Sequence, residues 1–271
     1  MKMIIKFICM VTFAIALVAC DKTTNEKATE SGTPTKINIA TTEISAAILQ
    51  PSLDWLKQHG IDAQLVIMSG NVNVIRAVND GSADAALGVH IKFMDSFNAQ
   101  NRGNLAMVQP YAFTTGIGLY SDKYTALDQI PDGAKIAIMN DAMNMDRGLR
   151  MLNEVGLIKL NSDHQGQFSL IDIKANPKNI ILVDMNQTQT VRALDDLDAA
   201  IVFFTHMKNA GKDFQHYIIR DNDAKDFPMG IVVQQQNAQQ PWAKLLAEAL
   251  LQQPVRDNIA QKFGGVFEYY Q

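Results

Sequence analysis

The 271-residue sequence has only two cysteines, Cys9 and Cys20, and no excess of basic residues. Two cysteines are too few for a disulfide framework or a thiolate zinc cluster. With 24 Lys and Arg against 28 Asp and Glu, the net charge is −4. The chain therefore lacks the excess of positive charge that drives counterion release from nucleic acid, and we expect no nucleic-acid partner. Ordinary proportions of hydrophobic (47%) and charged (19%) residues argue against a disordered chain.

No apolar run near the N-terminus is long enough to cross a hydrocarbon core, which takes about 20 helical residues. The apolar stretch 7–17 follows Lys2 and Lys6 and leads into Leu17-Val18-Ala19-Cys20. This layout is typical of a secretory signal. Its last four residues resemble a bacterial lipobox, in which the cysteine is acylated. An ordinary signal cleaved nearby and an uncut N-terminal anchor are the alternatives.

The lipobox predicts a signal peptide at residues 1–19 and lipidation of Cys20, which would hold the protein on a membrane. Residues 20–35 then form a flexible tether, since 21–35 contain no large apolar side chain. Asp21 directly follows the cysteine, as in lipoproteins retained at the inner membrane of bacteria with two membranes. We therefore expect the cell envelope, on the periplasmic face of that membrane.

The rest of the chain contains the same order of elements twice. Short alternating strands at 36–39 and 135–138 each precede a helix that ends at a glycine, Gly60 or Gly156. A β-rich segment (65–68; 180–183), a second helix (76–80; 192–196) and a third strand (84–87; 198–201) follow, and each half reaches a histidine, His90 or His206. Such β-α-β-α-β units build parallel sheets with helices on their faces. The sequence predicts an α/β protein with two lobes, each a mostly parallel sheet flanked by helices.

Glycine-containing strands just before and after the second repeat indicate where the chain crosses between lobes. We expect lobe one to comprise residues 36–115 and 230–271, and lobe two residues 116–229. Segments 241–251 and 255–263 are predicted to be amphipathic helices that pack back on lobe one.

The carboxyl ends of parallel strands, where helix N-termini also point, are the usual place for ligands. The predicted strands of this chain end just before residues 41–43, 69–73, 88–92, 140–147, 185–188 and 203–206. These segments are rich in amides and hydroxyls, and we expect the ligand site there. A cleft between the lobes would bring them together around a small polar molecule. The candidate ligand-binding residues in these segments are Thr42, Glu43, Asn71, His90, Asn144, Arg147, Phe203 and Thr205.

Arg147 is the strongest candidate, because a guanidinium pairs bidentately with a carboxylate. Asn144 lies three residues earlier and shares its helix face. The alternative is an exposed helix arginine paired with Asp146 or Glu154.

The chain lacks the sequence patterns of catalysis and cofactor binding. No His-x-x-x-His or Glu-x-x-His spacing surrounds His90 or His206, and no nucleophile elbow, phosphate loop or dinucleotide fingerprint is present. The methionines near the second repeat are typical of adaptable packing. We expect no metal, no cofactor and no enzymatic activity.

Several short motifs together carry a resemblance to one family. They are Ile130-Pro131-Asp132-Gly133-Ala134-Lys135-Ile136-Ala137-Ile138, Asn140-Asp141, Gly156-Leu157-Ile158-Lys159-Leu160, Asn176-Pro177-Lys178-Asn179 and Arg192-Ala193-Leu194-Asp195-Asp196-Leu197-Asp198-Ala199-Ala200. With the lipobox in front, they resemble the NlpA lipoprotein family over residues 36–271. The resemblance implies a periplasmic-binding-protein-like fold that closes on a free amino acid, by default methionine, and delivers it to an ABC permease and ATPase. It places Asn144 and Arg147 at positions that bind the charged backbone groups of the amino acid.

The pocket segments depart from the family pattern at 41–43, 68–71, 86–93 and 203–206, where Glu43 and Lys92 would add charge. Methionine, a related amino acid and a small carboxylate all stay open as ligands of this importer component, which we expect to be a monomer. The alternative function is a lipoprotein that keeps the two lobes as a sensor or partner-binding module without transport.

Overall fold

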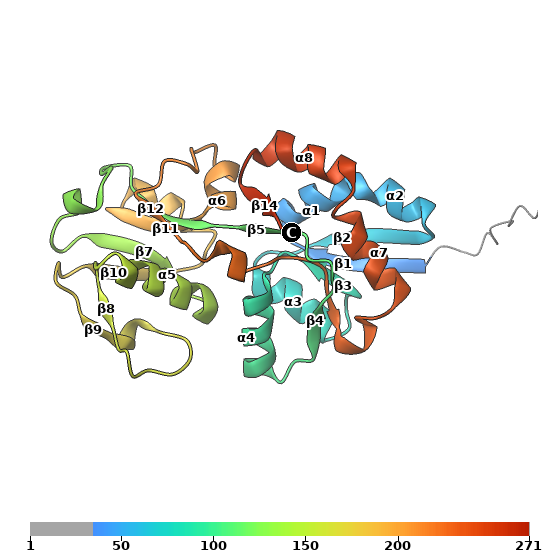
Figure 1. Ribbon diagram of the computed structural model, residues 1–271, viewed down its shortest axis with the longest axis horizontal. Coiled ribbons are helices and arrows are strands. Elements are labelled where there is room, and N and C mark those ends of the chain that lie inside the picture. The colour runs from blue at the N-terminus through green and yellow to red at the C-terminus, as the bar shows by residue number, and fades with distance from the viewer. Residues whose placement is uncertain (1–34, 271) are drawn as a thin grey trace, which may run out of the picture. The chain divides into compact units, whose positions relative to one another are not determined.

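The computed structural model describes residues 35–270 and contains two five-stranded sheets within them (Figure 1). The first sheet has the order β2-β1-β3-β13-β4, with bounds Ile61–Ile67, Thr35–Thr41, Ala85–Leu87, Val232–Gln234 and Leu105–Met107. The second has the order β10-β7-β11-β6-β12, with bounds Ile181–Met185, Lys135–Met139, Ala199–Phe203, Ile117–Tyr120 and Ile219–Arg220. In each sheet the first three strands are parallel and the fourth is antiparallel to the third. The predicted two-lobed α/β fold is confirmed.

Helices cover both faces of the first sheet because neighbouring residues of a strand point to opposite sides. Ile39 of β1 packs in one apolar cluster with Ile48 and Val255, whereas Ala40 packs in another with Val74. The helices are α1 (Glu43–Leu49), α2 (Leu53–Gln58), α3 (Asn71–Asn79), α4 (Ile91–Asn101), α7 (Pro241–Ala249) and α8 (Gln253–Phe263). Helices α7 and α8 pack on α2 and α1, so the two C-terminal helices expected from the sequence are confirmed.

The second lobe has fewer helices among the described residues: α5 (Ala142–Glu154) and α6 (Phe204–Asn209). The segment expected as a helix at 192–196 forms only a 3₁₀ turn, η4 (Arg192–Asp195). Two small ladders pair β5 (Phe113–Thr115) with β14 (Phe267–Tyr269) and β8 (Lys159–Leu160) with β9 (Ile173–Ala175). The other 3₁₀ turns are η1 (Gln50–Ser52), η2 (Leu127–Gln129), η3 (Leu170–Asp172), η5 (Ala224–Asp226) and η6 (Gln235–Asn237).

One aspartate anchors the third strand of each repeat. The Asp84 carboxylate accepts a hydrogen bond from the backbone amide of Asn38 at 2.8 Å. The Asp198 carboxylate accepts one from the backbone amide of Lys135 at 2.9 Å. Asn38 and Lys135 therefore occupy equivalent positions in the two repeats, whereas the sequence pattern paired Lys36 with Lys135. A shift of two residues leaves every side chain on its original face of the sheet, so the repeat pattern is unaffected.

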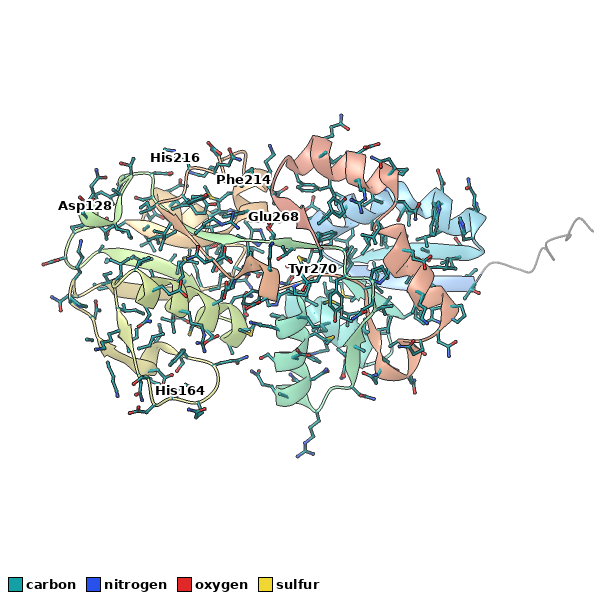
Figure 2. All side chains as sticks on the ribbon, in the orientation of Figure 1. Asp128, His164, Phe214, His216, Glu268 and Tyr270 are labelled. Atoms are coloured by element: carbon teal, nitrogen blue, oxygen red, sulfur yellow. The ribbon has the colours of Figure 1, made fainter. Side chains whose placement is uncertain are left out.

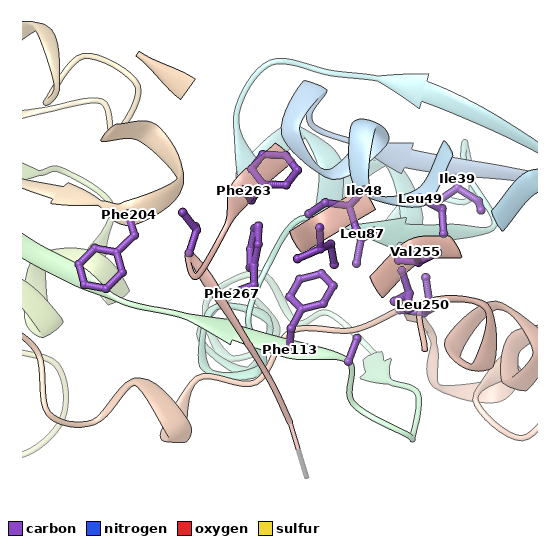
Figure 3. Close-up of a cluster of buried hydrophobic side chains, with 14 of the residues drawn as sticks. Ile39, Ile48, Leu49, Leu87, Phe113, Phe204, Leu250, Val255, Phe263 and Phe267 are labelled. Carbon is purple, nitrogen blue, oxygen red and sulfur yellow. The ribbon is translucent and has the colours of Figure 1, made fainter. Parts of the chain in front are cut away.

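Two chain segments connect the lobes and lie side by side. The first runs from β5 to β6 through Gly116, and the second runs from β12 to β13. The Met229 amide donates to the Phe113 carbonyl at 2.7 Å, and the Asp221 amide donates to the Ile117 carbonyl at 3.1 Å. Beside them, one cluster of buried hydrophobic side chains includes residues of both lobes, among them Phe204, Phe113 and Phe267 (Figure 3). We call the two chain segments that connect the lobes the crossing segments.

All described residues belong to one compact unit. Within that part of the chain, no helix combines the length and apolar character needed to cross a bilayer. Cys20, Asp21, the signal peptide and the tether up to residue 34 lie outside the described residues, and Thr35 already belongs to β1.

Gly116 is required by the close approach of the crossing segments to the second lobe. A Cβ atom there would lie 2.6 Å from the Phe204 ring and 2.9 Å from the Asp221 carboxylate, whereas at Gly230 it would meet Met107 at 3.4 Å. We predict that Gly116→Ala lowers the free energy of unfolding by about 2 kcal/mol because of this overpacking. Gly230→Ala, in the other crossing segment, is the matched control. Equal urea denaturation midpoints for the two variants would contradict the prediction.

Candidate functional site

A pocket of about 680 Å³ opens between the two lobes, at the carboxyl ends of the parallel strands of each sheet. The first lobe lines it with residues 42–45, 67–71, 88 and 90, and the second with 187–188, 191–192, 203, 205–206 and 209–210. Thr115, Met229 and Phe267 complete it where the lobes meet. Five of the six segments selected from the sequence contribute to this lining. Segment 140–147 does not.

The candidate residues are accordingly divided between the pocket and its surroundings. Thr42, Glu43, Asn71, His90, Phe203 and Thr205 line the pocket, whereas Asn144 and Arg147 do not. Lys92, expected to add charge, is also outside the lining; it lies 3.7 Å from Asp226 and over the Phe227 ring. Ligand binding by any of these residues stays a prediction.

His90 is buried at the N-terminus of α4 and connects the two lobes. Its Nδ1 accepts a hydrogen bond from the Phe93 amide at 3.0 Å, so the proton of the neutral ring sits on Nε2, 3.3 Å from Asn144 Oδ1. Burial lowers the pKa of His90 to about 3, and the Arg147 charge adds to that effect. His90 is therefore a neutral hydrogen-bonding group at physiological pH.

Asn144 is fully buried, and protein groups occupy both ends of its side-chain amide. Its Oδ1 faces His90, and its Nδ2 donates to Asp141 Oδ2 at 3.0 Å. Asp141 also caps α5, because its Oδ1 accepts a hydrogen bond from the backbone amide of Asn144. Because desolvation is the largest influence, the pKa of Asp141 is raised. Asn144 thus ties the start of α5 to the first lobe.

Arg147 is 2% exposed, and its guanidinium holds both crossing segments. Nη2 forms a buried ion pair with Asp221 of the second segment and donates to the Thr115 carbonyl of the first at 3.2 Å. The Phe227 ring centroid lies 4.0 Å from the guanidinium carbon, within cation–π range. The alternative of an exposed arginine paired with Asp146 or Glu154 is wrong, because Asp146 pairs with Arg150 and Asp221 neutralises Arg147.

Burial dominates the electrostatics of this ion pair. Desolvation raises the pKa of Asp221 and lowers that of Arg147, while the mutual attraction opposes both shifts. Nε and Nη1 of Arg147 have no hydrogen-bond partner among the described residues, and Asp223 Oδ1 is 3.9 Å from Nε. The guanidinium is thus neutralised by Asp221 but not saturated with hydrogen bonds.

Sequence reasoning missed several groups at this site. Asp221 lies 74 residues from Arg147, outside any local pattern. Gln187 falls in a selected segment but was not singled out, and Arg192 was noted only as part of the repeat. His206, whose pKa burial lowers to about 4, and Asn209 also line the pocket.

Histidines elsewhere add no site. His164 lies in a loop of the second lobe, where Nδ1 is 3.0 Å from Asp172, and both it and His216 are labelled in Figure 2. Among residues 35–270, no three His, Cys, Asp or Glu side chains gather closely enough to hold a metal ion.

Comparisons with known proteins agree with the fold. The NlpA lipoprotein family model matches residues 37–268. The chain is 26% identical to the methionine-binding lipoprotein MetQ of Bacillus subtilis over 94% of both chains. It is 33% identical to the D-methionine-binding lipoprotein MetQ of Escherichia coli, over about half of each (53%). A nutrient binding protein from Burkholderia cenocepacia, solved bound to methionine, superposes with a TM-score of 0.78 at 25% identity, covering 86% of this chain and 99% of that one.

We predict that Asp221→Asn lowers the free energy of unfolding by about 3–5 kcal/mol, because it removes the close counter-charge of a buried guanidinium and leaves only Asp223, 3.9 Å from Nε. Asp226→Asn, which breaks the exposed pair with Lys92, should cost at most about 1 kcal/mol. Urea denaturation of both variants measures the difference, and similar losses would contradict the prediction.

The double variant Arg147→Met, Asp221→Leu tests the same interaction without leaving a lone charge. Replacing both partners by apolar groups should restore stability to within about 1 kcal/mol of the wild type or above it. A double variant as unstable as Asp221→Asn would show that packing around the side chains, and not charge, explains the loss.

Acidification should destabilise the protein through His90, which is buried, and His206, which is half-buried. Both folded-state pKa values, about 3 for His90 and about 4 for His206, lie below the unfolded value of 6.5, so the unfolded state binds more protons below pH 6.5. Stability should therefore fall between pH 6.5 and 5 by about 1 kcal/mol per histidine per pH unit. His90→Asn, which can still cap α4, should remove about half of this slope; an unchanged slope would refute the assignment.

Proposed function

This chain belongs to the NlpA lipoprotein family, and we propose from that premise that it is the solute-binding component of an ABC importer. Its ligand would be a free amino acid or a close analogue, held in the pocket between the lobes. The observation that carries the proposal is the pocket itself. It lies at the carboxyl ends of the parallel strands of two sheets, and its volume is in the usual range for small-molecule sites. The methionine complex of the Burkholderia cenocepacia protein supports an amino acid in this fold.

Binding would close the lobes, because the pocket walls come from both sheets and, within the described residues, only the crossing segments join the lobes covalently. We propose that the hinge lies near Gly116 and near residues 229–230, which would divide the chain into 36–115 with 230–271 and 116–229. Hinges of this kind absorb the motion in a few residues while each lobe moves rigidly.

Family membership also supports the cellular arrangement that we propose. Cys20 would carry the lipid anchor, holding a monomer at the periplasmic face of the inner membrane, next to a permease and its ATPase. The protein would deliver its ligand unchanged, with no catalytic step.

We predict that at least one L-amino acid stabilises the protein; a ligand at a hundred times its Kd should add about 2.7 kcal/mol to the free energy of unfolding. Thermal unfolding against the twenty amino acids, with native mass spectrometry for a co-purified ligand, provides the measurement. Ser69→Trp, which fills the pocket, should abolish the stabilisation, and Ser162→Trp, on the exposed surface of the second lobe, should not.

A negative result is equally informative. If no amino acid stabilises the wild type and no small molecule co-purifies, transport of an amino acid is refuted. The alternative of a sensor or partner-binding module would then be the better account.

A further inference from the structure

The pocket carries one charged side chain of each sign. Glu43 lies at the start of α1 in the first lobe, and Arg192 begins η4 in the second. Neither forms an ion pair with another residue of the described chain. His90 and His206 add no charge near neutral pH, since burial depresses the pKa of each. The pocket is therefore dipolar from one lobe to the other, which suits a zwitterion that touches both.

Arg147 is poorly placed to supply the positive charge of the site. It lies outside the pocket lining, and Asp221 already balances its charge. Displacing that carboxylate would leave Asp221 buried and unpaired, which is strongly unfavourable. Arg192 needs no such exchange.

Gln187 is the one lining residue whose side-chain oxygen is buried without a partner among the described residues. Gln187 is 9% exposed, and its Oε1 is buried without a hydrogen-bond partner among the described residues. Buried polar groups in native proteins are almost always hydrogen-bonded, so an unpartnered acceptor on a residue that lines the pocket points to a ligand group.

The turn that carries Gln187 is held firmly and also presents Arg192. Thr190 Oγ1 donates to the Gln187 carbonyl at 2.8 Å, and the Arg192 amide donates to the Gln189 carbonyl at 3.0 Å. One short segment of the second lobe therefore places Arg192 and Gln187 in the lining of the same pocket.

A side-chain amide has an NH₂ group that donates hydrogen bonds and an oxygen that accepts them. A ligand group that satisfies both must itself contain a donor and an acceptor. A second primary amide meets this requirement, whereas a thioether offers only a weak acceptor. A site built for hydrogen bonds discriminates strongly against an analogue that lacks them.

We propose that the pocket binds a zwitterionic amino acid with an amide side chain: Arg192 pairs with the carboxylate, Glu43 with the ammonium, and Gln187 with the amide. This assignment rests on the proposed function and specifies the ligand class. It makes Gln187 the residue that determines specificity and gives Glu43 and Arg192 the role of closing the lobes around a dipole.

Isothermal titration with L-glutamine and L-methionine tests the amide contact, because the two ligands are both unbranched and similar in length. The wild type should bind L-glutamine at least tenfold more tightly than L-methionine. Gln187→Met, which removes the amide at similar side-chain length, should abolish or reverse that preference. Tighter binding of L-methionine by the wild type, unchanged in Gln187→Met, would overturn the assignment.

The charge pair is tested with Arg192→Gln and Glu43→Gln, each of which should weaken L-glutamine binding at least thirtyfold. Arg76→Gln, at the position that matches Arg192 in the first repeat, and Glu154→Gln, at the exposed end of α5, are the matched controls and should bind as the wild type does. L-Glutaminamide, which lacks the carboxylate, should bind the wild type weakly and lose little further affinity in Arg192→Gln. Equal effects of Arg192→Gln and Arg76→Gln would refute the carboxylate contact.

The outcomes separate this assignment from the proposed function. Binding of L-methionine with no effect of the three pocket variants leaves the importer proposal intact and overturns the ligand class. No binding of any amino acid at millimolar concentration overturns both.

Discussion

The buried ion pair between Arg147 and Asp221 is the interaction on which the arrangement of the two lobes depends. Arg147 belongs to α5 of the second lobe, and through Asp221 and the Thr115 carbonyl it holds both crossing segments against that lobe. Phe227 packs over the guanidinium, and Gly116 leaves the space into which Asp221 and Phe204 fit. Two charges so deeply buried are tolerated only because they neutralise each other. The crossing segments are therefore held at α5, a helix that does not line the pocket.

This arrangement also determines the electrostatics of the pocket. A guanidinium that is already balanced by Asp221 adds no net charge to the lining, so Glu43 and Arg192 are left as its charged groups. They lie on different lobes, and a dipolar ligand would therefore favour the closed arrangement over an open one. Family membership places this dipolar pocket in a scaffold whose solved relative holds methionine. The chain keeps that scaffold while presenting its own set of polar groups.

Much of the fold was predictable because it follows from local patterns. Alternating apolar residues at Ile37 and Ile39 predicted a strand, and Gly60 and Gly156 ended their helices with positive φ, as residues without a Cβ can. The pocket edge was predictable too, because parallel strands of one sheet end on the same side. Local patterns failed where packing decided the outcome. Residues 192–195 form a 3₁₀ turn in place of a helix, and the two repeats differ in register by two residues.

The sequence by itself determined the two-lobed fold, the family and most of the segments that line the pocket, since these depend on periodicity and on motifs of neighbouring residues. Only the tertiary structure decided which charged side chains are neutralised by a protein partner and which are left unpaired in the pocket lining. A buried arginine must have a counter-charge, but nothing near Arg147 in the chain specifies Asp221, 74 residues away. In the same way, the composition of the loop after β10 cannot show that Gln187 Oε1 has no partner among the described residues. Hydrogen bonding and charge balance at a buried site depend on which distant segments pack around it, and only the folded chain brings those segments together.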